Sequence, residues 1–253
     1  MTPPPRLVAF DLDDTLAPSK SAIDVRMGTL LLALADRVEV AIISGGQLDQ
    51  FTAQVIDQLP APSAAALAPF HLLPACGTQY YRIRPDGIET VYALVLDAAQ
   101  RMEAAVVLEE EARRLGVWEE KTWGAIIEDR GSQVTFSALG QQAPVDAKSA
   151  WDPTGAKRNA LSAAVARRLP DLEVRSGGST SIDVTDRGID KAYGMRRLVE
   201  QTGIPLDDML FVGDRLDPAG NDYPVLAMGA RCHAVTGWES TAAFLEELIP
   251  RLR

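Results

Sequence analysis

The chain has 253 residues, of which 47% are hydrophobic and 24% charged, as in ordinary globular domains. This length allows one large domain or two smaller ones. The formal net charge of -10 argues against nucleic acid as the main partner, because binding a phosphate backbone requires a basic surface. No segment reaches the roughly 18 consecutive apolar residues of a transmembrane helix, so we expect no membrane partner.

The N-terminus and the two cysteines suggest a protein of the cytoplasm. Residues 1–6 lack the pattern of a signal peptide or membrane anchor. Cys76 and Cys232 match no metal-binding spacing and are too few for a disulfide framework. Both lie in apolar, strand-like segments, so we expect buried free thiols and a cytoplasmic location.

Acidic residues follow the first apolar segment. Residues 7–10 have the continuous apolar pattern of a buried strand in a parallel sheet, and Asp11, Asp13 and Asp14 come directly after them. Like charges this close repel one another unless a cation or a reaction uses them. Parallel sheets also hold ligands just beyond the carboxyl ends of their strands. The alternative is a solvated acidic turn.

The N-terminal part alternates between strand and helix patterns. Residues 23–37 and 47–58 have apolar residues at helical spacing, whereas residues 38–43 and 71–76 have the pattern of buried strands. This alternation predicts parallel strands joined by right-handed crossovers, which is the start of a doubly wound α/β sheet.

The middle of the chain has a different pattern. Antiparallel pairs are expected at residues 80–94, 125–139 and 172–184, because each contains two strand-like runs around a turn. Helices are expected at residues 97–115, with Asp97 as N-cap, and at residues 153–169. Hairpins with helices on one face form an α+β layout. We therefore expect an inserted α+β domain at residues 81–186.

The first pattern returns near the C-terminus. Helices are expected at residues 190–201 and 240–252, and strands at residues 209–212 and 232–235. These complete an α/β core made of residues 1–80 and 187–253. An insert whose two ends lie close together has two hinges, as a moving lid requires.

Polar residues recur at the ends of the predicted parallel strands and at the start of a predicted helix. Each has an ordinary explanation when taken alone: a helix N-terminus, a solvated lysine or a polar loop. Their combination at these positions favours a reaction. These residues are Asp11, Asp13, Ser44, Gly45, Lys191, Asp214, Asn221 and Asp222.

This set of motifs resembles that of the haloacid dehalogenase superfamily, and the large insert resembles the α+β cap of its sugar-phosphate branch. The second half of the insert and the end of the core are similar to the eukaryotic-type phosphomannomutases. The similar segments are residues 128–132, 137–140, 177–184, 190–191 and 213–222. The resemblance implies a phosphoryl-transfer enzyme that uses Mg2+.

The resemblance also implies roles for the core residues. Asp11 would be the nucleophile; a carboxylate with an ordinary pKa of about 3.9 is ionised at neutral pH and needs no base. Asp13 would protonate the leaving oxygen and later deprotonate the attacking one. Mg2+ would be held by Asp11, Asp214 and Asp222, and by Asp13 through its carbonyl.

The remaining roles concern phosphate and sugar. Ser44, with Gly45, and Lys191 would bind the non-bridging phosphate oxygens. In the cap, Arg130 would clamp phosphate, because a guanidinium matches phosphate oxygens in a fixed fork. Ser181 and Asp183 alternate onto one face of a strand and would bind hydroxyls. The alternatives are a surface arginine at a hairpin turn and an ordinary polar strand face.

Two positions depart from the phosphomannomutase pattern. Gln141 and Trp123 stand where that pattern has arginines, and the first of these helps to hold the distal phosphate. Each lost charge should weaken the hold on a bisphosphate by about 1.5 to 3 kcal/mol. A compensating charge could come from one of four nearby basic residues: Lys121, Lys148, Lys157 or Arg158.

We therefore expect a Mg2+-dependent phosphatase acting on a small phosphorylated sugar or related metabolite. The alternative is a mutase that interconverts mannose 6-phosphate and mannose 1-phosphate. A non-catalytic binding protein is a third reading, against which the intact motif residues argue. The expected partner is a small phosphate ester. A homodimer is implied only by the resemblance, because phosphomannomutases often dimerise through their caps.

Overall fold

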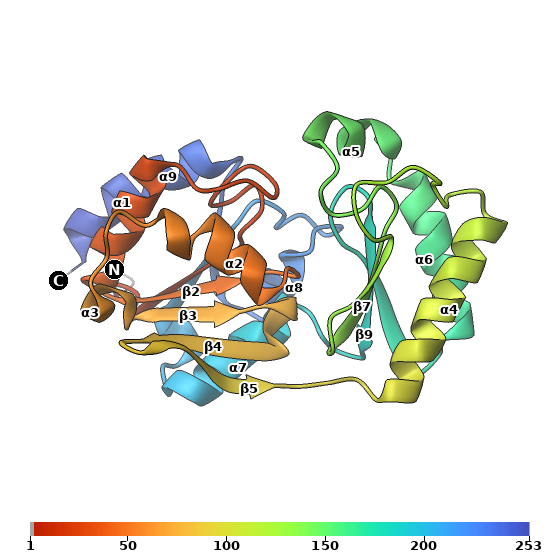
Figure 1. The fold of residues 1–253 in the computed structure, drawn as a ribbon. Coiled ribbons are helices and arrows are strands. Elements are labelled where there is room, and N and C mark those ends of the chain that lie inside the picture. Colours follow the sequence, from red (N-terminus) through yellow and green to blue (C-terminus); the bar gives the residue numbers. More distant parts are fainter. Residues whose placement is uncertain (1–2, 253) are drawn as a thin grey trace. The chain divides into compact units, whose positions relative to one another are not determined.

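The computed structural model describes residues 3–252, which fall into two compact units (Figure 1). The larger unit comprises the chain up to Ala93 together with the chain from Asp190 onward, and the smaller unit comprises Leu94–Ile189. Within the described residues, no helix has both the length and the apolar character needed to cross a membrane.

The larger unit is built on one mixed sheet. Its strands run in the order β11-β10-β1-β2-β3-β4-β5. The first five of these are parallel to one another, whereas β4 pairs antiparallel with β3 and with β5. The doubly wound α/β prediction is thereby confirmed. The strands are β1 (Leu7–Phe10), β2 (Glu39–Ile43), β3 (Phe70–Leu73), β4 (Gln79–Arg84), β5 (Gly87–Ala93), β10 (Met209–Gly213) and β11 (Arg231–Ala234).

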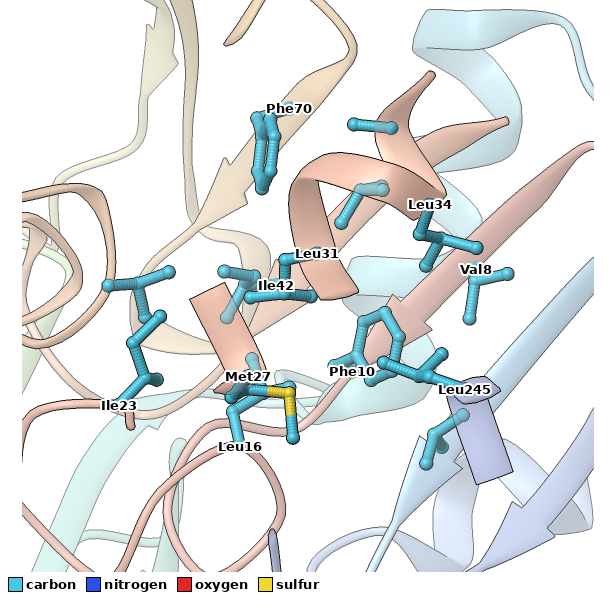
Figure 2. Packing of buried hydrophobic residues seen from close by; sticks show 14 of the residues in the cluster. Val8, Phe10, Leu16, Ile23, Met27, Leu31, Leu34, Ile42, Phe70 and Leu245 are labelled. Carbon is cyan, nitrogen blue, oxygen red and sulfur yellow. The ribbon is translucent and has the colours of Figure 1, made fainter. Parts of the chain in front are cut away.

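Helices cover both faces of this sheet (Figure 1). Successive side chains of a strand point to opposite faces, so Val8 and Phe10 belong to one core cluster and Leu7 and Ala9 to another. Figure 2 shows Phe10 beside Leu245 in the first cluster. That cluster contains residues of α1 (Val25–Ala35), α2 (Leu48–Gln54) and α9 (Trp238–Leu248), with Leu67 of α3 (Ala64–Leu67) packed against it. The second contains residues of α7 (Lys191–Thr202) and α8 (Tyr223–Ala227).

Short 3-10 turns continue several of these elements. They are η1 (Ile56–Gln58), η2 (Ala75–Gly77), η3 (Leu206–Asp208) and η4 (Ile249–Arg251). Cys76 and Cys232 are not joined in a disulfide and are only half-buried, which corrects the expectation of buried thiols. Cys76 falls in the η2 turn, because β3 ends earlier than the predicted strand 71–76.

The first hairpin belongs to the larger unit, and this corrects the predicted boundary at residue 81. β4 pairs with β3, with Arg82 opposite His71, so β4 and β5 extend the parallel sheet. The units divide after Ala93 and after Ile189. Alternating apolar and polar residues identify the two strands of a hairpin but not the sheet that the hairpin joins. For this reason the sequence-based prediction assigned the hairpin to the insert.

The smaller unit is an antiparallel sheet with helices on one face. Its order is β6-β7-β9-β8, from β6 (Ile127–Asp129), β7 (Gln133–Ser137), β8 (Leu172–Ser176) and β9 (Ser181–Asp186). Val134, Phe136, Ile182 and Val184 form its core with residues of α4 (Ala98–Arg114) and α6 (Ala156–Arg168). Both predicted strand pairs are confirmed.

Of the helices in the smaller unit, α4 begins with a side-chain N-cap and α5 (Val145–Trp151) does not. Asp97 caps α4 as predicted: it accepts a hydrogen bond from the Ala99 N–H, and Gln100 completes a capping box. The sequence did not predict α5 (Val145–Trp151), which begins after Pro144 without a side-chain cap.

Candidate active site

The carboxyl end of β1 lies at the point where the order of the sheet reverses. From β1 the chain builds β2 and β3 on one side, and β10 and β11 lie on the other. Ligands of open α/β sheets bind at such a switch point. Asp11 directly follows β1 and Asp214 directly follows β10, so the fold brings these two carboxylates from distant segments to adjacent strand ends.

A buried lysine joins two of the carboxylates. The Lys191 Nζ lies 2.6 Å from Asp11 Oδ1 and 2.5 Å from Asp222 Oδ1, and all three side chains are almost fully buried. Lys191 is the first residue of α7, where its charge opposes the helix dipole. The two carboxylates supply the compensation that this position requires.

A glycine allows Asp222 to approach the end of β10. A Cβ atom on Gly213 would lie 2.4 Å from Asp222 Oδ2, closer than any side chain tolerates. The same carboxylate oxygen accepts a hydrogen bond from the Arg215 N–H at 3.0 Å. Asp222 is therefore fixed by backbone and lysine together, whereas its neighbour Asn221 is exposed.

The acidic cluster has the donor set of a divalent-cation site. One carboxylate oxygen from each of Asp11, Asp214 and Asp222 lies within 4.8 Å of the others. Carboxylate oxygens suit hard cations such as Mg2+. Thr15 donates a hydrogen bond from Oγ1 to Asp214 Oδ1 at 3.3 Å, and this contact orients the half-buried member of the cluster.

Burial and the mutual repulsion of the carboxylates shift the pKa values in this cluster. Burial raises the pKa of Asp11 well above its ordinary value, with Asp222 acting in the same direction and Lys191 against it. Burial and Asp222 likewise raise the pKa of Asp214. Burial alone would lower the pKa of Lys191, but Asp11 and Asp222 outweigh it and the pKa is raised. The lysine is therefore a permanent cation, and additional positive charge would favour the ionised carboxylates.

Asp13 lies on a tight loop directly after Asp11. Its Oδ1 accepts a hydrogen bond from the Lys20 N–H at 2.6 Å. Asp14 has a left-handed backbone with φ of 61°, and its carboxylate accepts from the Ser19 N–H at 3.1 Å. The loop thus orients the Asp13 carboxyl, while Asp14 points into the turn and is exposed.

The Ser44 loop follows β2 and is fixed by a neighbouring turn. Ser44 is buried, and its Oγ accepts from the Gly46 N–H at 3.3 Å. The η2 turn binds the same loop: Ala75 N–H donates to Gly46 O at 3.0 Å and Cys76 N–H to Ser44 O at 2.9 Å. Apart from the single glycine at position 77, no sequence pattern predicts that this turn supports the Ser44 loop.

The cap candidates lie on the polar face of the smaller unit's sheet. Asp183 Oδ1 accepts from Gln133 Nε2 at 2.6 Å and from Thr135 Oγ1 at 2.8 Å. Ser181 is opposite Ser137 in the next row. The Arg130 guanidinium donates to Glu128 Oε2 at 2.6 Å, and its side chain is only 8% exposed, so it is not a solvated surface arginine.

The structure therefore gathers the core candidates and the cap candidates in separate units. Asp11, Lys191, Asp214 and Asp222 form one cluster, and Asp13, Ser44 and Gly45 follow the ends of β1 and β2 beside it. Arg130, Ser181 and Asp183 belong to the polar face of the other sheet.

The chain is similar to known proteins along most of its length. The family described as "Eukaryotic phosphomannomutase" matches residues 27–251. Phosphomannomutase of Saccharomyces cerevisiae is 25% identical over 264 residues, covering 97% of this chain and 94% of the yeast protein. Phosphomannomutase of Schizosaccharomyces pombe is 26% identical over 260 residues, covering 97% and 95%. The relatives thus span both units.

Solved structures share the fold at lower identity. A haloacid dehalogenase-like hydrolase from Bacteroides thetaiotaomicron has a TM-score of 0.65 at 17% identity, covering 96% of this chain and 99% of its own. The N-terminally truncated IMP-nucleotidase of Plasmodium falciparum has a TM-score of 0.72 at 14% identity, covering 99% and 71%. The chain shares its fold with the haloacid dehalogenase-like hydrolase, and it is a member of the eukaryotic phosphomannomutase family of phosphoryl-transfer enzymes.

Proposed function

We propose that this protein is a Mg2+-dependent phosphatase of a small phosphorylated sugar, acting through a phosphoaspartate at Asp11. The larger unit would be the catalytic core and the smaller unit the cap that selects the substrate. The observation that carries the proposal is the buried Asp11–Lys191–Asp222 cluster with Asp214 beside it. A cluster of this kind provides a nucleophile, a fixed cation and ligands for a metal.

In the first half of the reaction, an Asp11 carboxylate oxygen attacks phosphorus and the bond from phosphorus to the sugar oxygen breaks. Asp13 donates its proton to that departing oxygen. In the second half, Asp13 takes a proton from water, the water oxygen attacks the phosphorus of the phosphoaspartate, and Asp11 is released with inorganic phosphate. Lys191 and Ser44 hold the transferring phosphoryl oxygens in both halves.

Mg2+ fits the oxygen donors of Asp11, Asp214 and Asp222. When bound, it neutralises charge on the phosphoryl group and on the carboxylates that hold it. Because the pKa values of Asp11 and Asp214 are raised by burial, added positive charge also helps to keep both groups ionised at neutral pH.

The polar face of the cap sheet supports a sugar as the leaving group. Gln133, Thr135 and Asp183 form one hydrogen-bonded set of donors and acceptors, with Ser137 and Ser181 in the next row. Hydroxyl-rich ligands are bound by such groups, since each sugar hydroxyl both donates and accepts.

The charges of the cap favour water over a second sugar oxygen as the final acceptor. Gln141 is neutral, and its Nε2 donates to Ser137 Oγ at 2.6 Å. Arg130 is paired with Glu128, and Trp123 is neutral. A mutase must retain a bisphosphate intermediate while that intermediate reorients in the site. A phosphatase needs only to bind its substrate and release the products.

The second candidate is a hexose phosphate mutase. It is favoured by the match to phosphomannomutases along almost the whole chain. Incubation with mannose 1-phosphate, with and without a hexose bisphosphate activator, separates the two functions. We expect free phosphate without an activator. Activator-dependent mannose 6-phosphate without comparable phosphate release would instead establish the mutase.

The family membership also makes a homodimer through the smaller unit our working proposal. Met102 and Val106 are exposed one turn apart on α4, with exposed fractions of 73% and 54%, and a second copy would cover them. Light scattering on the full chain and on Met102→Lys tests this: a dimer that the substitution dissociates is expected, and a wild-type monomer would refute it.

A further inference from the structure

Tyr92 is the half-buried residue of an exposed edge strand. It lies on β5, at one edge of the larger unit's sheet, and every other residue of β5 is exposed. The Tyr92 ring packs against the core cluster that contains residues of α7. From α7, the Arg197 Cζ lies 4.5 Å from the centroid of the ring. The ring is therefore fixed between the sheet and α7.

The Tyr92 hydroxyl donates to the turn that supports the Ser44 loop. It lies 2.7 Å from the carbonyl oxygen of Gly77, in the η2 turn. Burial raises the pKa of Tyr92 to about 12, so the hydroxyl keeps its proton at neutral pH. The residue before Gly77, Cys76, donates its N–H to the Ser44 carbonyl at 2.9 Å. A chain of hydrogen bonds thus leads from the Tyr92 side chain to the Ser44 backbone.

The η2 turn depends on contacts from outside itself. Cys76 has a left-handed backbone with φ of 56°, which is unfavourable for a residue with a Cβ. Such a conformation persists only where the surroundings fix it. On one side the turn packs on α7, where a Cβ on Gly77 would lie 2.6 Å from the Gly194 Cα. The Tyr92 hydroxyl provides a contact from β5, so removing it should let the turn and the Ser44 loop shift.

We propose that Tyr92 is a positioning residue for phosphate binding, which fixes the Ser44 loop through the Gly77 carbonyl. This rests on the proposed function, in which the Ser44 loop binds phosphoryl oxygens, and deepens it. Tyr92 also precedes Ala93, the last residue of the larger unit before the chain passes into the smaller one at Leu94. The connection to the proposed cap is thus joined to the support of the phosphate loop, and loosening it at Tyr92 lowers the affinity for phosphate.

Binding of inorganic phosphate tests this inference without turnover. Isothermal titration calorimetry on the full chain with Mg2+ measures the Kd for phosphate. Tyr92→Phe removes only the hydroxyl and keeps the ring beside Arg197. We expect the Kd to rise about three- to tenfold, the range of one hydrogen bond. The KM for mannose 1-phosphate should rise by a similar factor, with a smaller change in kcat.

Tyr80→Phe is the matched control. The Tyr80 ring centroid lies 5.7 Å from that of Tyr92, but its hydroxyl contacts the His71 Nδ1 at 2.7 Å instead of the turn. We expect this variant to lower the urea midpoint of unfolding at least as much as Tyr92→Phe and to leave the Kd for phosphate unchanged. A loss of stability alone would therefore not reproduce the effect of Tyr92→Phe.

A double-mutant cycle tests whether Tyr92 acts through the Ser44 loop. Ser44→Ala removes the hydroxyl proposed to bind phosphate. If Tyr92 acts by positioning that loop, Tyr92→Phe should weaken phosphate binding less in the Ser44→Ala background than in the wild-type protein.

The failures are distinguishable. An unchanged Kd in Tyr92→Phe, an equal rise in Tyr80→Phe, or full additivity with Ser44→Ala would overturn the inference about Tyr92. None of these results depends on hydrolysis of a sugar phosphate. If the wild-type protein releases no phosphate from mannose 1-phosphate or mannose 6-phosphate, the proposed phosphatase is wrong, whereas the role of Tyr92 in phosphate binding is decided by the Kd alone.

Discussion

At the scale of single residues, Lys191 is the side chain on which the core site depends. Its single positive charge lies between the Asp11 and Asp222 carboxylates, in a region from which water is largely excluded. Removing one partner of a buried ion pair leaves an uncompensated charge. The lysine thus supports the folded state as well as the proposed chemistry.

Lys191→Met should therefore lower the free energy of unfolding by about 3 to 5 kcal/mol. Saturating Mg2+ should restore part of this loss, because it supplies positive charge to the same carboxylates. Urea denaturation with and without Mg2+ measures both effects. Lys121→Met, at an exposed position, is the control and should stay within about 0.5 kcal/mol of wild type. An unchanged Lys191→Met protein would contradict the buried ion cluster.

At the scale of elements, the η2 turn connects the Ser44 loop to helix α7. Ala75, Cys76 and Gly77 all have positive φ, at 46°, 56° and 89°. Left-handed backbone costs an ordinary residue about 1 to 2 kcal/mol. The turn is held by bonds to the Ser44 loop and by close packing on α7, where a Cβ on Gly77 would lie 2.6 Å from the Gly194 Cα.

Gly77→Ala should therefore be much more disruptive than its backbone angle alone explains. Gly203→Ala is the matched control in the same unit, with φ of 67° and no atom within 4 Å of the added Cβ. We expect about 1 kcal/mol of destabilisation for the control and about 2 kcal/mol more for Gly77→Ala. Gly77→Ala should also raise the substrate KM, because the Ser44 loop shifts. Equal unfolding midpoints for the two variants would refute this role.

Some helices and strands could be predicted from sequence patterns and others could not. The buried strands were predictable because a continuous apolar run needs cover on both faces, and the acids after β1 and β10 followed from where such strands end. The short helices α5 and α8 were not, since segments of seven and five residues are too short to show a helical repeat of apolar residues. The hairpin β4–β5 was identified but assigned to the wrong unit, because pairing with β3 depends on long-range register.

Side-chain contacts between distant segments of the chain could not be predicted from the sequence either. Asp222 and Lys191 are 31 positions apart, and Thr15 and Asp214 are 199 apart. Local patterns place such residues at element ends but contain no distances. The buried hydrogen bonds of His71 with Glu39 and Tyr80 could not be predicted from any local pattern. They arise because β2, β3 and β4 are neighbours in the sheet.

At the scale of the whole molecule, this network predicts how stability depends on pH. The His71 Nε2 lies 2.7 Å from Glu39 Oε2, so it carries the proton, and Nδ1 lies 2.7 Å from the Tyr80 hydroxyl. Burial lowers the pKa of His71, with Arg82 and Arg84 acting in the same direction and Glu39 against them. The folded protein therefore keeps this histidine neutral at a pH where the unfolded chain takes up a proton.

The free energy of unfolding should consequently fall as the pH drops below about 6.5, the ordinary value for histidine, by up to roughly 1.4 kcal/mol per pH unit. The hydrogen bond from His71 also lowers the pKa of Glu39, so a further loss follows at more acidic pH. Urea denaturation at pH 7.5 and 5.5 measures the first effect. His71→Gln should be less stable at pH 7.5 and show a smaller loss on acidification. An equal loss in both proteins would mean that other groups cause it.

The central claim about the whole molecule is that phosphoryl transfer passes through Asp11. Brief reaction with substrate and Mg2+, followed by acid quench and borohydride reduction, converts a phosphoaspartate to homoserine, which mass spectrometry locates in the chain. We expect homoserine at position 11 and at no other aspartate, and neither homoserine nor phosphate release in a folded Asp11→Asn protein. Substrate turnover with position 11 unmodified, or full activity of Asp11→Asn, would contradict the account.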